Sequence, residues 1–298
     1  MKRILLAVML AVPLVALAEP QGQNLVFRGG TDLVTVDVNV YSGKKPVTGL
    51  KSEDFEVYDS GVRQVVTDVT YGRLPIDLRL VFDTSGSIDD IELQTYVRAM
   101  KQIAQSLQPQ DRCDIVTFSR RIVEAAALQP PPVKIDARRV AGNTTSFFDA
   151  VSLALITPPV LGRRQLTIVM SDAEDNSSFF DQAAMTEIVK RTDAVVYAVL
   201  PITTWHPTDD KEDKIMLERL STLTSMTGGR IISPNHDLEI VPAFLTAIEE
   251  FRKSYVVAYT ATGVDRPGWH DLKVNVHGTK TYDVRARRGY VGATVQIP

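Results

Sequence analysis

The sequence predicts an α/β fold: a doubly wound, mostly parallel sheet, with a small β-sandwich-like domain formed jointly by the N- and C-terminal strands. Three observations predict it. Between Ile76 and Arg252, short apolar runs alternate with segments whose apolar residues recur every three or four positions. On either side of that region, alternating apolar and polar residues indicate strands without helices. A chain of 298 residues is also long enough for about two domains.

Residues 1–18 have the features of a signal peptide. Lys2 and Arg3 precede an apolar stretch from Ile4 to Val15, and the next three residues, Ala-Leu-Ala, fit a small-x-small cleavage site. We therefore expect an exported protein, periplasmic or secreted, that starts at Glu19 after cleavage. No later segment has the roughly 18 uninterrupted apolar residues of a transmembrane helix, so no membrane span is expected in the mature chain.

Residues 19–74 are expected to be an N-terminal β segment. Leu33–Tyr41 alternates large apolar and polar side chains, and a Ser60-Gly61 turn separates two more short strands, Phe55–Asp59 and Val65–Tyr71. Residues 31–72 therefore predict a small antiparallel sheet. Because three strands alone are only marginally stable, we expect this segment to pair with a C-terminal β segment, residues 254–298. That segment contains three expected strands: Tyr255–Thr260, Asp271–Val276 and Thr281–Arg287.

Residues 75–253 are expected to form the α/β domain. Its first strand is the apolar run Leu78–Phe82, and apolar residues from Leu93 to Leu107 predict the helix that follows. Two runs joined by Ser119-Arg120-Arg121 predict a hairpin that adds one antiparallel edge strand. In chain order, the remaining expected elements are strands Cys113–Phe118 and Ile122–Ala127, helix Phe147–Ile156, strand Leu166–Met170, helix Gln182–Arg191, strand Ala194–Leu200, helix Lys214–Leu223, strand Arg230–Ser233 and helix Pro242–Arg252. The one cysteine, Cys113, lies in an apolar run and is expected to be a buried thiol.

Polar side chains follow two of the buried strands and also precede a helix. Functional groups of open α/β sheets gather in the loops after the carboxyl ends of the strands. Asp83, Ser85 and Ser87 follow the first parallel strand, Thr145 lies in the loop before the Phe147 helix, and Asp172 follows strand Leu166–Met170. Oxygen donors with only two carboxylates suit a hard cation such as Mg²⁺.

These residues resemble the metal-ion-dependent adhesion site (MIDAS) of a von Willebrand factor A-type domain. The resemblance rests on Asp83-x-Ser85-x-Ser87, a Thr some sixty residues later, and a Ser-Asp pair after the next buried strand. It implies a Rossmann-like domain over roughly residues 75–253. Sequences around Glu53-Asp54-Phe55 and around Arg287-Arg288-Gly289-Tyr290 also resemble a group of secreted bacterial proteins of this type.

The resemblance implies a role for each site residue. Ser85 and Ser87 would ligate Mg²⁺ or Mn²⁺ directly through their hydroxyls, and Asp83 and Asp172 would act in the immediate shell of the metal, often through water. Thr145 would be the ligand that engages or withdraws. It is preferred to Thr144 because three residues then separate it from Asp149-Ala150, as in the family pattern.

Two positions depart from that pattern. Asn143-Thr144 replaces the usual Gly pair, and Ala173 replaces the Gly that commonly follows the second Asp. Neither change removes a ligand atom, but Ala173 would resist a backbone conformation with positive φ.

The function that follows is an exported protein-binding or adhesion module, without enzymatic activity, whose metal binds an acidic side chain of a partner protein. The formal charge of −3 and the absence of a basic stripe argue against nucleic acid as that partner. Two aromatic pairs, Phe147-Phe148 and Phe179-Phe180, and Trp205 could border the site with apolar surface, although a Phe of each pair could instead begin the buried face of a helix.

Two other classes of protein remain open. One is a structural module of an envelope assembly that does not depend on metal. The other is a metal-dependent phosphotransferase or hydrolase with Asp83 as nucleophile, but Ser85 stands where a haloacid dehalogenase-type enzyme needs its general acid. The sequence also contains no nucleophile elbow, phosphate-binding loop or His-Glu-x-x-His motif.

Overall fold

The computed structural model describes residues 33–72, 74–85, 90–138, 144–200, 211–234, 239–264, 267–278 and 281–292, without the side chains of 90–92. The expected signal peptide, residues 1–18, lies outside this part of the chain. Within the described ranges, no helix combines the length and the apolarity needed to cross a membrane.

The central part of the chain forms a six-stranded sheet in the order β11-β10-β9-β6-β7-β8. Its strands pair in parallel, except for β8, which pairs antiparallel with β7 at one edge. The sequence predicted this antiparallel edge strand correctly. The strands are β6 (Ile76–Asp83), β7 (Arg112–Phe118), β8 (Ile122–Gln129), β9 (Arg164–Met170), β10 (Val195–Val199) and β11 (Ile231–Ile232).

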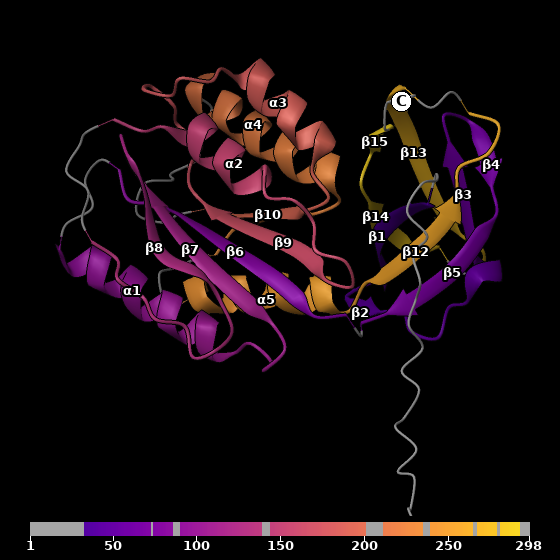
Figure 1. Ribbon diagram of the computed structural model, residues 1–298, viewed down its shortest axis with the longest axis horizontal. Coiled ribbons are helices and arrows are strands. Elements are labelled where there is room, and N and C mark those ends of the chain that lie inside the picture. The colour runs from indigo at the N-terminus through magenta and orange to yellow at the C-terminus, as the bar shows by residue number, and fades with distance from the viewer. Residues whose placement is uncertain are drawn as a thin grey trace, which may run out of the picture. The chain divides into compact units, whose positions relative to one another are not determined.

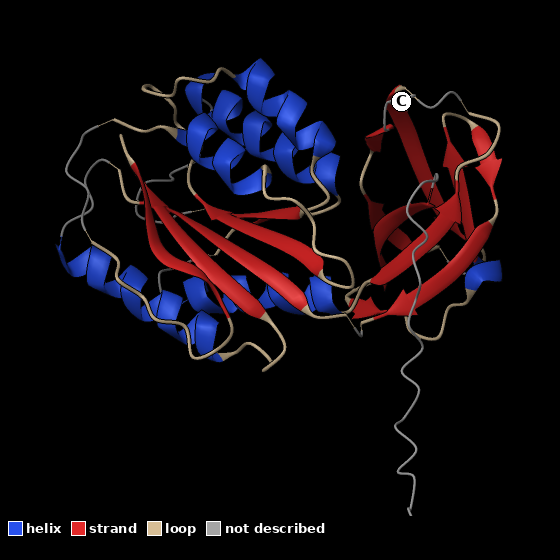
Figure 2. Cartoon of the chain, in the orientation of Figure 1, coloured by secondary structure: helices blue, strands red, loops and turns tan. Residues whose placement is uncertain are grey.

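Helices cover both faces of this sheet, as Figure 2 shows. Helices α1 and α5 lie on one face, and α2, α3 and α4 lie on the other (Figure 1). The prediction of an α/β fold is thereby confirmed. The helices are α1 (Asp90–Gln105), α2 (Phe147–Leu155), α3 (Gln182–Arg191), α4 (Lys211–Thr227) and α5 (Ile240–Arg252).

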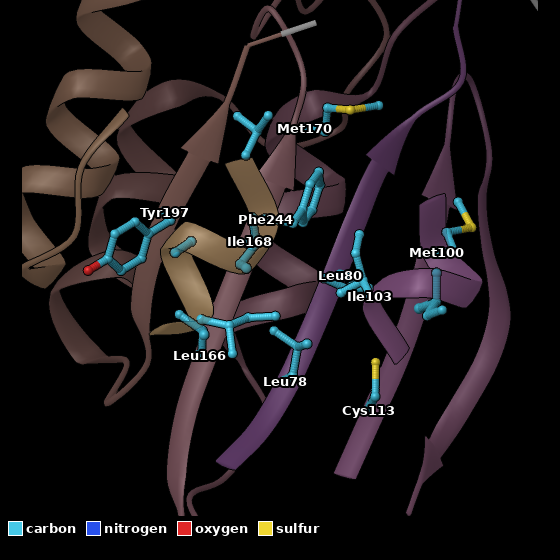
Figure 3. Close-up of a cluster of buried hydrophobic side chains, with 14 of the residues drawn as sticks. Leu78, Leu80, Met100, Ile103, Cys113, Leu166, Ile168, Met170, Tyr197 and Phe244 are labelled. Atoms are coloured by element: carbon cyan, nitrogen blue, oxygen red, sulfur yellow. The ribbon is translucent and has the colours of Figure 1, made fainter. Parts of the chain in front are cut away.

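The central strands are apolar on both faces because each face packs against helices. On β6, Leu78, Leu80 and Phe82 point into the core beneath α1 and α5, whereas Val81 points into the core beneath α2, α3 and α4. Figure 3 shows the first of these cores, with Leu78 and Leu80 beside side chains of the neighbouring strands. Cys113 belongs to it as a free, buried thiol whose pKa is raised by burial, in agreement with the expectation.

The terminal strands form two antiparallel sheets that share one apolar cluster. One sheet has the order β14-β1-β12-β5 with β2 beside β1, and the other has the order β15-β13-β3-β4. The first contains β1 (Leu33–Ser42), β2 (Lys45–Pro46), β5 (Val66–Tyr71), β12 (Tyr255–Thr260) and β14 (Asp283–Ala286). The second contains β3 (Phe55–Asp59), β4 (Val62–Gln64), β13 (Gly268–Val276) and β15 (Gly289–Gly292), and a short 3-10 helix, η1 (Ser52–Asp54), precedes β3.

The expectation that residues 31–72 form one small sheet is wrong. Strand β1 pairs with β12 and β14, whereas β3 pairs with β13 and β4. The apolar side chains of β1 and β3, among them Val38 and Val57, thereby meet in the shared cluster between two sheets. Strands β2, β4 and β15 were not anticipated, because two to four residues are too few to show a period of two.

A buried carboxylate links the two terminal sheets. Asp59 of β3 is fully buried, and its Oδ2 accepts hydrogen bonds from the hydroxyls of Tyr259 (2.9 Å) and Tyr290 (2.7 Å). Its Oδ1 lies 2.8 Å from Nδ1 of His270. Tyr259 belongs to β12, in the sheet opposite Asp59, so this cluster fixes the two sheets against each other.

We predict that Asp59→Ala lowers the free energy of unfolding by at least about 3 kcal/mol, because each buried polar group that loses its partner costs about 1 to 3 kcal/mol. Urea denaturation of the full chain measures the difference. Asp68→Ala, which removes an exposed carboxylate from β5, is the matched control and should change stability by less than about 0.5 kcal/mol. Equal effects of the two substitutions would contradict this role for Asp59.

Candidate functional site

The site begins at the carboxyl end of β6. Asp83 is the last residue of that strand, and its Oδ1 accepts hydrogen bonds from the backbone N–H (3.0 Å) and the hydroxyl (2.6 Å) of Ser85. Strand β9 runs parallel to β6, with Phe82 opposite Met170, so the residues that follow also meet. The hydroxyl of Ser171 donates to Oδ2 of Asp83 at 2.6 Å. Two loops far apart in sequence therefore join at one carboxylate.

Asp83 is a buried carboxylate in an acidic environment. Only 8% of the residue is exposed, and burial raises its pKa to about 6 against the opposing hydrogen bonds from Ser171 and Ser85. The negative charge of Asp172 raises this pKa further. In the described part of the chain, no basic side chain forms an ion pair with Asp83. No described side chain therefore compensates this negative charge.

Thr145 lies against the loop that follows β9. Its N–H donates to the side-chain oxygen of Asn176 (2.8 Å), and its carbonyl accepts the N–H groups of Asn176 (3.0 Å) and Ser177 (3.1 Å). Thr145 is 4% exposed. The hydroxyl of the preceding Thr144 is buried and has no hydrogen-bond partner among the described residues. The loop before α2 thus brings two threonines to the loop that carries Asp172.

Asp172 and Ala173 form a tight turn after β9. Oδ1 of Asp172 accepts the N–H of Glu174 at 3.0 Å, and the N–H of Ala173 donates to the hydroxyl of Ser171 at 3.0 Å. Ala173 has a φ of 65°, the positive value that the sequence indicated an alanine would resist. The left-handed conformation costs a non-glycine residue roughly 1 to 2 kcal/mol. Its methyl group is fully buried against the α2–α4 core, which offsets part of that cost.

The donors gathered here fit a hard cation. Each of them is an oxygen, the kind of donor that hard cations prefer. Among the described residues, no group of three or more His, Cys, Asp or Glu side chains lies close enough together to hold a metal ion. The hydroxyl of Ser85 donates its hydrogen bond to Asp83, so the lone pairs of the Ser85 oxygen remain available to a cation. Ser87 lies outside the described residues, so its place in the set stays a prediction.

The aromatic residues near the site divide into two kinds. Phe147 and Phe148 are buried in the core beneath α2, as the helix-face alternative anticipated. Phe179 and Phe180 are exposed, at 92% and 41%, with ring centroids 5.9 Å apart. Trp205 lies outside the described residues.

Sequence reasoning missed several residues that hold the site together. Ser171 was noted only as part of a Ser-Asp pair, yet its hydroxyl bonds Asp83. Asp149 lies in the first turn of α2, and Asp175 and Asn176 lie in the loop after Asp172; all three bond backbone groups of the facing loop. Short polar residues in a loop were the available signal, but they did not reveal which backbone groups would face them.

No protein-family model and no curated protein matches the sequence. Solved structures do resemble it. Proximal thread matrix protein 1 from the mussel byssus is 16% identical with a TM-score of 0.46, and the similarity covers 59% of this chain and 48% of that one. This chain therefore matches about half of that protein's length.

Two further structures have similar scores. A von Willebrand factor type A protein from Catenulispora acidiphila is 11% identical over 90% of this chain and 76% of its own, with a TM-score of 0.46. The manganese-loaded TRAP protein of Plasmodium vivax is 15% identical over 79% of this chain and 99% of its own, with a TM-score of 0.41. Because these TM-scores lie below 0.5, the similarities identify neither a ligand nor a partner for this chain.

We predict that Ser171→Ala lowers the free energy of unfolding by about 1 to 3 kcal/mol, because a buried oxygen of Asp83 loses its donor and the N–H of Ala173 loses its acceptor. Ser152→Ala is the matched control: Ser152 is also buried, but its hydroxyl has no partner among the described residues. That substitution should change stability by less than about 0.5 kcal/mol. Chemical denaturation without added metal measures both, and a Ser171→Ala protein as stable as Ser152→Ala would show that the bond contributes nothing.

Proposed function

We propose that this chain is an exported protein-binding module, of the von Willebrand factor A type, that uses Mg²⁺ or Mn²⁺ to bind an acidic side chain of a partner protein. One observation carries the proposal. The buried carboxylate of Asp83 has no basic partner in the described part of the chain, faces the negative charge of Asp172, and shares hydrogen bonds with two serines. Removing such a charge from water is costly unless a positive charge compensates it.

The proposed metal ligands are Asp83, Ser85, Ser87, Thr145 and Asp172. Ser85 and Ser87 contribute hydroxyl oxygens, and Asp83 and Asp172 contribute the negative charge. Thr145 is the proposed ligand that engages or withdraws. The orphaned hydroxyl of Thr144, which is buried beside it, keeps Thr144 open as the alternative. When bound, the cation supplies a coordination position that a carboxylate oxygen of Asp or Glu can fill.

The chain's own residues prepare the site for that exchange. The hydrogen bonds from Ser85 and Ser171 hold both oxygens of Asp83 in fixed directions. In the turn at Ala173, the N–H of Glu174 holds Oδ1 of Asp172, whose negative charge acts on Asp83. Asp83 and Asp172 would formally balance the two positive charges of the cation, and its open coordination position would be what accepts a carboxylate oxygen of the partner.

Export and the choice of partner are part of the same proposal. Residues 1–18 would direct the chain to the periplasm or the exterior, and the partner would be a protein rather than nucleic acid. A metal-independent envelope module is the first alternative, and a phosphotransferase using Asp83 is the second. One observation argues against the enzyme. Two residues after Asp83, where such an enzyme needs a carboxylic acid, the chain has Ser85, whose hydroxyl donates a hydrogen bond to Asp83.

We predict that millimolar Mg²⁺ raises the melting temperature of the wild-type chain, compared with the same protein in chelator, and leaves that of Asp83→Asn unchanged. A cation that ties several loops together stabilises by mass action, by about 2.7 kcal/mol at a hundredfold excess over Kd. For a chain of this size, that corresponds to roughly 5 to 10 °C.

The matched control is Asp136→Asn, an exposed carboxylate paired with Arg138 outside these loops, which should respond to Mg²⁺ as the wild type does. Identical melting in chelator and in Mg²⁺ would favour the metal-independent module. Mg²⁺-dependent release of phosphate from phosphoesters that vanishes in Asp83→Asn would favour the enzyme.

We also propose the domain organisation that the sequence indicated. Residues 75–253 would be the doubly wound metal-binding domain, and residues 19–74 and 254–298 would close together as a β-sandwich-like domain. The pairing of β1 with β12 and of β3 with β13 supports that closure.

We predict that a fragment of residues 74–253 stays soluble and monomeric, whereas deletion of residues 271–298 from the full chain causes aggregation. The deletion removes β14 and β15 and most of β13, and so leaves the edges of β1 and β3 unpaired and exposes part of the apolar cluster between the two sheets. Size-exclusion chromatography separates the two outcomes. A monomeric, well-folded deletion variant would refute the closure.

A further inference from the structure

At the proposed site, the start of α2 and the loop after β9 are linked because carboxylates of each segment accept backbone N–H groups of the other. Asp149, in the first turn of α2, accepts the N–H groups of Phe179 and Phe180 on its two carboxylate oxygens, each at 2.8 Å. Those two residues belong to the loop that starts with Asp172. The N–H of Asp149 in turn donates to the hydroxyl of Ser178 at 3.1 Å.

The facing loop returns the same kind of contact. Oδ2 of Asp175 accepts the N–H of Phe148, at the start of α2, at 2.9 Å, and also the hydroxyl of Ser178. The side-chain oxygen of Asn176 accepts the N–H of Thr145 at 2.8 Å. Each loop therefore satisfies backbone N–H groups of the other, and the N–H of Thr145 is one of these groups. We call Asp149, Asp175 and Asn176 the latch.

The latch takes the place of a local cap at the N-terminus of α2. A serine immediately before a helix usually caps it with its own side chain. Ser146 occupies that position before α2, but its side chain makes no capping bond and contacts Arg120 and Ser177 instead. The N-terminus of α2 is satisfied from the other loop by Asp175. The chain thus uses a long-range bond, which ties two loops together, where a local one would serve the helix alone.

We propose that Asp149, Asp175 and Asn176 are positioning residues that hold Thr145 against the loop carrying Asp172 and thereby set the affinity of the site for Mg²⁺. This inference rests on the proposed function, since it concerns the same site. The physical reason is preorganisation: ligands on two free loops must be ordered when the cation binds, and that ordering opposes binding. Residues that orient metal ligands typically change metal affinity by about 10- to 100-fold when they are replaced.

The test is calorimetric titration of the full chain with Mg²⁺ alone. In Asp149→Asn the side chain keeps its size but has one acceptor oxygen for two N–H groups, so we expect the affinity to fall by about 10- to 100-fold. Asn176→Ala, which removes the bond to the N–H of Thr145 together with a 3.3 Å bond to the exposed carboxylate of Glu174, should lower the affinity as well. This second variant alters an exposed side chain and keeps the test valid if Asp149→Asn folds poorly.

The matched control is Asp181→Ala. Asp181 follows Phe180 directly, but its carboxylate caps its own helix, α3, by accepting the N–H of Ala184 at 2.8 Å. Loss of this cap destabilises the protein without releasing the loop that carries Thr145. We therefore expect a lower melting temperature in chelator but a Mg²⁺ affinity like that of the wild type.

Hydrogen exchange of the Phe179 and Phe180 amides is the second readout. If the latch and the metal site act together, Mg²⁺ slows exchange of these two amides in the wild type, and a purely structural latch gives the same exchange with and without Mg²⁺. Equal affinities in the wild type and both latch variants would overturn the positioning role and leave the proposed function standing. No Mg²⁺ binding by the wild type would overturn both.

Discussion

The parallel pairing of β6 with β9 is the constraint on which the rest of the site depends. Both strands are buried on both faces, so a shift of one residue in their register would move every core side chain to the opposite face. The apolar core therefore fixes the register far more strongly than the polar loops could. Because the register is fixed, Asp83 and Ser171 emerge from neighbouring strand ends and meet at 2.6 Å. The position of the carboxylate follows from the packing of leucines and valines beneath it.

Burial of Asp83 lowers stability at this edge of the sheet. A carboxylate of ordinary pKa in water would contribute nothing unfavourable to folding, whereas here the loss of solvation raises its pKa to about 6. Ala173 adds backbone strain one residue after the second carboxylate. Strain and uncompensated charge typically gather where a protein binds something. The hydroxyls that bond Asp83 and the hydrogen bonds between the two loops hold this unfavourable arrangement in place. The surrounding apolar core supplies the stability that the site lacks.

Much of the fold could be predicted from the sequence, because apolar periodicity reports directly on burial. The runs around Leu80 and Ile168 indicated buried strands, and the spacing of Tyr96, Met100 and Ile103 indicated α1. The sequence led us to expect that the two terminal segments pair, but not which strands do so: the C-terminal partners of β1 and β3 lie some two hundred residues away, and the choice depends on which apolar faces meet. At the site, the sequence indicated the loops and the oxygen donors. It did not reveal that Asp149 faces two backbone N–H groups, because that depends on the path of the opposite loop.

The two edges of the central sheet limit how this protein can meet another. Strand β11, at one edge, has only two residues, and β8, at the other, departs from regular register with β7 at two places. Short or irregular edges offer few aligned N–H and C=O groups, and natural sheets use them to prevent strands of other chains from adding on. Strands of neighbouring copies therefore find no long, regular edge of this sheet to pair with, which opposes open-ended polymerisation through it. A partner protein would therefore contact side chains of the loops rather than a strand edge.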